Sequence, residues 1–177
     1  MNISTTRYRV ILLAGFFLIG WRGTSHGQSI EEIFRWTAGQ MKVSGTVAMP
    51  AVRIVSRAEI KRIFIENNRG AYLRWESDYG EDRAQEIMQD YLSEIVGLFD
   101  PPTGVVYVGD FLSPCRREAI LAHEMTHYFQ QKCWGPIEDA GPETQIRKWK
   151  REMEAYGNEE KYSRTFCPEA PSTATPE

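Results

Sequence analysis

The sequence Ser113-Pro-Cys-Arg-Arg-Glu-Ala-Ile-Leu-Ala-His-Glu-Met-Thr-His127 joins a helix start to two histidines four residues apart. Ser113 is a favoured N-cap residue, and the proline after it is favoured at the first helical position. These features predict a helix that carries residues 116–131.

The two histidines predict a metal site on that helix. Residues four apart lie on one face of a helix, so His123 and His127 can both reach one metal ion. Glu124 is rotated about 100° from His123, so its carboxylate can reach a water at the metal instead of the metal itself. Two ordinary helix histidines without a metal are the alternative interpretation.

The segments on either side of this helix predict an α+β fold. Two short β-rich runs, Ile95–Phe99 and Val105–Val108, are separated by the turn-forming sequence Asp100-Pro-Pro-Thr-Gly104 and predict a β-hairpin. A last helix is expected from about residue 143 to residue 162. The result is a small domain with a short twisted sheet, the histidine helix as active-site helix, and a C-terminal ligand helix.

The upstream segments predict further helices and strands. Ser29 with Glu32 and Ser56 with Glu59 have the spacing of capping boxes, which start helices. The sequence Asn67–Gly70 is expected to end the second of these helices. The other expected elements are helices over 29–40 and 82–93 and strands over 50–56 and 71–76.

The 177 residues carry 21 Lys and Arg against 24 Asp and Glu, a formal net charge of −3. This length suits one domain with a core of its own. The chain does not have the excess of basic residues that is typical of nucleic-acid-binding proteins. We therefore expect no nucleic-acid partner.

The first 27 residues have the layout of a secretory signal peptide. Arg7 and Arg9 precede the apolar run Val10–Trp21, and small residues suited to cleavage follow. The 12 residues of this run would make a helix of about 18 Å against roughly 30 Å of bilayer hydrocarbon, so no stable membrane span is expected. An uncleaved N-terminal anchor is the alternative. We expect a signal peptide over 1–27, an exported (periplasmic or secreted) domain over 28–166 and a disordered tail over 167–177.

Through the His-Glu-x-x-His motif, the preceding hairpin and the following helix, the chain resembles the zincin superfamily of metallopeptidases. The similar part covers about Ile95 to Tyr162. The resemblance implies a Zn²⁺ cofactor and hydrolysis of peptide bonds, with His123 and His127 as metal ligands and Glu124 as general base. It also implies that a peptide or protein substrate binds along an edge strand, here Val105–Val108.

The third ligand distinguishes the zincin subclasses. The metzincin pattern has a glycine and a third histidine where this chain has Gln130 and Cys133. The gluzincin pattern has a glutamate on a later helix, followed by alanine and, four residues after the glutamate, by an acid. Glu154 and Ala155 match that pattern, while Asn158 replaces the acid. The resemblance therefore implies Glu154 as ligand and Asn158 as the residue that orients a ligand histidine.

Helix spacing bears on Glu154 in two ways. If the two helices are antiparallel about a loop centred between residues 139 and 140, residue 125 lies opposite Glu154. However, Glu154 is roughly 130° from the centre of the apolar stripe expected to face the core, which consists of Ile146, Trp149, Met153 and Tyr156. Glu152 borders that stripe. The alternative third ligands are Glu152, Asp139 and Cys133.

Two tyrosines near the expected ligand are candidate oxyanion donors, since zinc hydrolases often use a tyrosine in this role. They are Tyr156 and Tyr162, with a packing role as the alternative for each. Two other functions stay open: a catalytically silent zinc-binding domain that recognises a partner after export, and a zinc hydrolase of a non-peptide, cell-wall amide. Glu124 favours catalysis, because a purely structural zinc does not need it.

Three cysteines in an exported domain suggest one disulfide and one free thiol. Cys115 and Cys133 would be about 27 Å apart along one helix, so they cannot pair. The antiparallel arrangement places residue 115 opposite about residue 164, close to Cys167. We therefore predict a Cys115–Cys167 disulfide with Cys133 buried and free. Three reduced thiols are the alternative.

Overall fold

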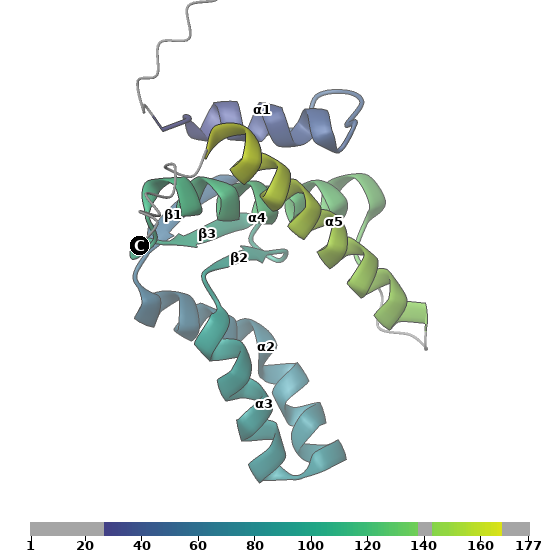
Figure 1. Ribbon diagram of the computed structural model, residues 1–177. Helices are drawn as coiled ribbons and strands as arrows, with labels where there is room; N and C mark the ends of the chain where they lie inside the picture. The colour runs from purple at the N-terminus through teal and green to yellow at the C-terminus, as the bar shows by residue number, and fades with distance from the viewer. Residues whose placement is uncertain (1–26, 138–142, 168–177) are drawn as a thin grey trace, which may run out of the picture.

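A computed structural model describes residues 27–137 and 143–167, and within them the chain has the predicted α+β fold. These residues form five helices and a small three-stranded sheet (Figure 1). The expected signal peptide, apart from its last residue, and the expected tail after Cys167 lie outside the described residues. No helix in the described part of the chain is both long and apolar enough to cross a bilayer.

In the sheet, β3 lies between β1 and β2, with β1 parallel to it and β2 antiparallel. The hydroxyls of Ser29 and Ser56 each accept a hydrogen bond from the backbone N–H three residues later, as expected of N-caps. Along the chain the elements are α1 (Ile30–Gln40), β1 (Ala51–Val55), α2 (Arg57–Tyr79), α3 (Glu81–Glu94), β2 (Gly97–Asp100), β3 (Val105–Gly109), α4 (Pro114–Trp134) and α5 (Glu143–Phe166).

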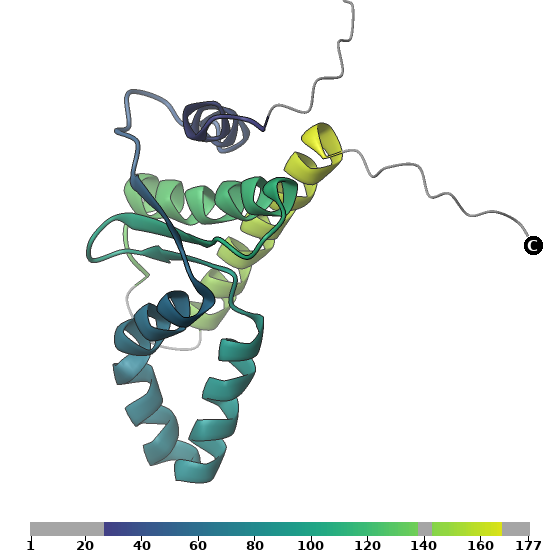
Figure 2. The same ribbon diagram turned by 90° about the vertical axis from the view of Figure 1, so that its left-hand side faces the viewer.

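Helix α4 is enclosed by the sheet on one side and by α1 on the other (Figure 2). Tyr128 packs against Phe99 of β2 with ring centroids 5.7 Å apart, and Phe129 packs against Phe34 of α1 at 4.9 Å. All residues from Ala119 to Thr126 are buried. The histidine motif therefore belongs to a core helix whose position is held from both sides.

The prediction of a strand over 71–76 is wrong, because α2 continues through this segment. Asn68 does not end the helix, and its side-chain amide donates to the Phe64 carbonyl one turn earlier, at 2.9 Å. Helix α3 gives the second half of α2 a packing partner, and Trp75 stacks on Tyr91 with ring planes 4° apart. The two helices form a pair that projects from the sheet (Figures 1 and 2). Tertiary contact here overrides the β-type composition.

The strand Val105–Val108, expected at the edge of the sheet, is the central strand instead. β1 pairs with β3 on the side opposite β2, with Val52 next to Val106. Both sides of β3 are thus occupied, so a substrate strand cannot add there. The prediction was wrong because β1 is far from β3 in the sequence, and the local hairpin pattern does not reveal that pairing. The edge strands are β1 and β2.

Helix α5 buries a different face from the one expected. Half or more of each side chain of Ile146, Trp149 and Met153 is exposed, although these residues form the apolar stripe. The buried residues of α5 are instead mostly small or polar, namely Thr144, Ala155, Asn158, Glu159 and Tyr162. Hydropathy alone therefore selected the wrong side of α5.

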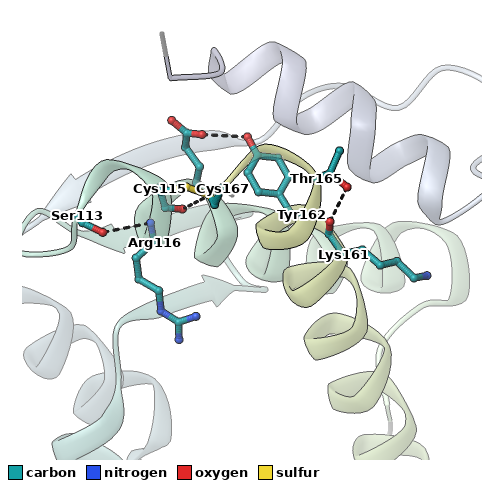
Figure 3. Close-up of a disulfide and its surroundings, with 8 residues drawn as sticks. Ser113, Cys115, Arg116, Lys161, Tyr162, Thr165 and Cys167 are labelled. Atoms are coloured by element: carbon teal, nitrogen blue, oxygen red, sulfur yellow. Dashed lines mark hydrogen bonds between the residues drawn. A yellow bond between two sulfur atoms is a disulfide. The ribbon is translucent and has the colours of Figure 1, made fainter. Parts of the chain in front are cut away.

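The predicted Cys115–Cys167 disulfide is confirmed and joins the start of α4 to the end of α5 (Figure 3). The Cα atoms of the two cysteines are 5.8 Å apart. Nearby, the Tyr162 hydroxyl donates to the Glu118 carboxylate at 3.1 Å. These contacts agree with the predicted antiparallel arrangement of the two helices. Cys133 is free as predicted, but it is exposed rather than buried because it lies in the last turn of α4.

Removal of this disulfide is expected to destabilise the protein. The bond spans a sequence separation of 52 residues, which corresponds to roughly 4 kcal/mol of unfolding free energy in the loop-entropy model. Replacing both Cys115 and Cys167 by Ala should lower stability in urea by up to about this amount. Cys133→Ala, the matched control at an exposed position, should change it little. A Cys133–Cys167 link in non-reducing peptide mapping would contradict the helix arrangement.

Candidate metal centre

Three side chains from α4 and α5 converge on one point. The Nε2 atoms of His123 and His127 lie 3.2 Å apart. The Glu152 carboxylate lies 3.4 Å from the His127 Nε2 and 3.7 Å from the His123 Nε2. Ligand atoms of a tetrahedral Zn²⁺ lie about 3.3 Å apart when the metal–ligand bonds are about 2.0–2.1 Å long. The three groups therefore have the spacing of a metal-ligand set.

The two helices contribute to this group in different ways. Helix α4 supplies both histidines from one face, because four residues are close to one helical turn. Helix α5 runs alongside and places Glu152 over them. The His123 side chain is 9% exposed and the Glu152 side chain 51% exposed. The centre is therefore enclosed on the α4 side and open beside α5.

His123 is oriented by an acid on α5. Its Nδ1 lies 2.9 Å from Glu159 Oε2, and the Arg116 guanidinium forms an ion pair with the other carboxylate oxygen. Burial favours the neutral acid, yet the hydrogen bond to His123 and the charge of Arg116 together lower the pKa of Glu159. An ionised Glu159 accepts the Nδ1–H of His123 and leaves Nε2 free for a metal.

His127 is oriented by an amide instead. Its Nδ1 lies 2.9 Å from Gln130 Oε1, which again directs Nε2 towards the other ligands. Burial opposes a positive charge on His127, but the hydrogen bond to Glu152 and the charges of Glu124 and Glu152 raise its pKa to about 9. The acids around the histidines therefore make this point favourable for a cation.

Glu124 lies next to the ligand group. Its side chain is buried, and burial raises its pKa against the opposing effect of the charges on His123 and His127. The backbone of Phe99 in β2 also favours the ionised carboxylate and so opposes this rise of the pKa. A carboxyl group whose pKa is raised in this way is suited to accept a proton and release it again.

The centre opens into a cleft of about 1080 Å³. β2 lines one side of it through Gly97–Phe99, and α3 contributes Tyr91. Tyr156 of α5 stands at the rim, more than half exposed, with its ring centroid 4.7 Å from that of His123. A sheet edge, a phenolic hydroxyl and the ligand group thus surround one volume.

The structure brings together three of the residues selected in the sequence, namely His123, Glu124 and His127, and joins Glu152 to them. Glu154, the ligand expected from the gluzincin pattern, is not part of this group. Its Oε2 accepts a hydrogen bond from Gln130 Nε2 at 3.1 Å.

The other selected residues lie elsewhere. Asn158 donates from Nδ2 to Thr126 Oγ1 at 3.1 Å, not to a histidine. Tyr162 is completely buried against α1 and donates a hydrogen bond to Glu118, so it is a core residue. Tyr156 lies beside His123 at the rim of the candidate metal centre. Cys133 is exposed. Asp139 lies outside the described residues.

Sequence reasoning missed Glu159 and kept Glu152 only as an alternative. Both belong to a pattern that was available, since Glu152, Tyr156 and Glu159 follow one another at intervals of four and three residues and share one face of a helix. Two acids on one helix face are a suitable counterpart for two histidines on another.

Comparisons with protein-family models, with curated proteins and with solved structures found no match.

The ligand group predicts which variants lose metal. The purified protein should bind about one divalent ion per chain, and His123→Ala or His127→Ala should remove most of it. Glu152→Ala should weaken binding by about tenfold or more, and Glu154→Ala should weaken it by less, because Glu154 contacts Gln130 and lies outside the ligand group. Elemental analysis and competition with a chromophoric chelator measure both quantities. Undiminished metal in both histidine variants would end the metal-centre interpretation, and reversed effects at 152 and 154 would restore Glu154 as ligand.

The close approach of β2 to α4 gives a second prediction. A Cβ on Gly97 would lie 2.5 Å from Ile120 Cγ2 and 2.7 Å from Glu124 Oε1. Gly97→Ala should therefore lower the unfolding free energy in urea by about 1–3 kcal/mol, as overpacking does. The matched control is Gly39→Ala inside α1, where nothing apart from the adjacent residues and the backbone of the helix itself lies within 4 Å of the new Cβ. It should be neutral or stabilising by up to about 1 kcal/mol, and equal effects at both glycines would refute the close contact.

Proposed function

We propose that this protein is an exported, gluzincin-like zinc metallopeptidase that hydrolyses peptide bonds. The observation that carries the proposal is the convergence of His123, His127 and Glu152 next to the buried Glu124, at the wall of an open cleft. Glu152 is the proposed third ligand. Glu154, which the sequence pattern favours, is the alternative that the metal-binding variants distinguish.

Zinc is the metal that suits this donor set. Two imidazole nitrogens and one carboxylate form a ligand set typical of catalytic zinc sites, which keep a further position for water or substrate. Structural zinc sites usually close all four positions with protein ligands. The exposure of the centre beside α5 supports the catalytic type. Zn²⁺ held there would supply Lewis acidity, which polarises a substrate carbonyl and makes water more acidic.

Glu124 is the proposed general base. It would accept a proton from the attacking water and deliver it to the amine nitrogen of the leaving group as the C–N bond breaks. The burial of Glu124 supports this role, because a raised pKa helps the carboxyl group both to accept and to release the proton. Tyr156 is the proposed donor to the oxyanion, since its ring lies beside His123 and is accessible at the rim.

The proposed substrate path follows β2 rather than β3. The Gly109 N–H donates to the Val96 carbonyl at 3.0 Å, and in this antiparallel register the backbone groups of Gly97 are directed away from β3. An extended peptide could add to this edge through main-chain hydrogen bonds. Because β2 lines the same cleft as the ligand group, a peptide substrate is favoured over other amides.

Export is part of the proposal. The Cys115–Cys167 disulfide is compatible with an oxidising compartment, where such bonds persist. The N-terminal segment with the layout of a signal peptide would provide the route, and residues 28–166 would be the working domain.

Glu124→Gln tests the proposed chemistry. The variant should keep its metal, because no ligand is removed, and should lose hydrolysis by about 10²-fold or more, because the proton acceptor is gone. Casein serves as substrate, with and without chelator, and metal content is measured on the same samples. A variant that stays active, or one that loses the metal, would contradict the role of Glu124.

The same assay separates the other functions. Peptidoglycan fragments form a second arm, and cleavage of these without cleavage of casein would assign the protein to non-peptide amides. Metal binding by the parent with no hydrolysis in either arm would indicate a partner-recognition domain.

A further inference from the structure

We propose that Gln130 is the positioning residue that decides which glutamate of α5 becomes the third metal ligand. It connects His127 to α5 in the register that places Glu152, and not Glu154, over the histidines. This inference rests on the proposed metal centre. Gln130 lies one turn after His127 and is only 1% exposed, so its polar groups depend on protein partners.

Both ends of the Gln130 amide are engaged. Its Oε1 lies 2.9 Å from His127 Nδ1, while its Nε2 donates to the Arg151 carbonyl at 2.9 Å and to Glu154 Oε2 at 3.1 Å. Glutamine is the side chain of this length that offers an acceptor oxygen and two N–H donors together. At a buried position these bonds are costly to lose, because water does not replace them.

The oxygen end orients the metal ligand. A carbonyl oxygen can only accept a hydrogen bond, so it favours the proton on Nδ1 of His127 and leaves the lone pair on Nε2. The same bond limits rotation of the imidazole ring. The Nε2 of His127 therefore points to the place where the His123 Nε2 and the Glu152 carboxylate also lie.

The nitrogen end sets the register of α5. Arg151, whose carbonyl it binds, comes directly before Glu152. Residues 152 and 154 are about 200° apart around a helix, so α5 can present only one of them to the histidines. The hydrogen bond from Gln130 Nε2 holds the Glu154 carboxylate away from the histidines. The Glu152 carboxylate then lies next to the Nε2 atoms of His123 and His127. The contact of Glu159 with His123 fixes α5 at a second point.

Gln130→Met tests the proposal, because methionine keeps the length of the side chain and removes the three hydrogen bonds. Co²⁺ is titrated into the full mature chain with its disulfide intact, and both the affinity and the visible absorption spectrum of the bound ion are measured. We expect an affinity about 10–100-fold lower than that of the parent, with an altered spectrum. The matched control, Asn158→Leu, removes a buried amide from the same helix interface and should lower stability without changing either readout.

A double-mutant cycle separates positioning from a general loss of stability. If Gln130 acts through Glu152, then Glu152→Ala should reduce Co²⁺ affinity much less in the Gln130→Met background than in the parent. Additive losses would overturn the proposal, because a purely structural role predicts independence of the two sites.

If Gln130→Met does not fold, an exchanged pair provides the test. Gln130→Glu combined with Glu154→Gln restores the contact between these positions with donor and acceptor exchanged. It should bind Co²⁺ more tightly than Gln130→Glu alone, and the absence of any difference would overturn the proposal. A parent that binds no Co²⁺ would remove the proposed function itself. A parent that binds it, with unchanged affinity and spectrum in Gln130→Met, would overturn only the role of Gln130.

Discussion

The antiparallel contact between α4 and α5 is the constraint on which the candidate metal centre depends. The Cys115–Cys167 disulfide joins the helices at one end, and the bonds of Gln130 join them towards the other. Between these points His123 meets Glu159. Because much of the contact is polar and directional, a shift of α5 by one residue would break several hydrogen bonds at once. A metal site that takes its third ligand from a second helix needs such a contact.

The sides of α4 that do not face α5 pack against the rest of the fold. The sheet and α1 enclose this helix, so the histidines belong to an element with little freedom to move. The open side is formed by β2, the α2–α3 pair and the rim of α5. The molecule thus has a packed part, formed by α1, α4 and the sheet, and an open cleft. Glu124 lies at the boundary between them, where it is buried and in contact with β2. This division combines a rigid group of possible metal ligands with an open cleft in a small domain.

Three of the wrong sequence predictions share one physical cause. The strand expected over 71–76 became helix because α3 packs along α2. The expected edge strand Val105–Val108 became central because β1 pairs with it from a distant part of the chain. The apolar stripe of α5 stayed exposed because the helix buries a mostly small or polar face instead, with hydrogen bonds to α4 such as the one from Asn158 to Thr126. In each case the deciding partner is another element of the fold, which the local sequence pattern does not show.

The sequence by itself determined the features that depend on neighbouring residues: the capped helix starts, the β-hairpin, the face shared by His123 and His127, and the place of Glu124 beside them. It also indicated the disulfide, because helix rise relates distances along two antiparallel helices. Only the tertiary structure decided the order of the strands, the buried face of α5 and the choice of Glu152 over Glu154. A helix offers a full circle of faces, and hydropathy does not identify the one that packs when the contact is made by buried hydrogen bonds.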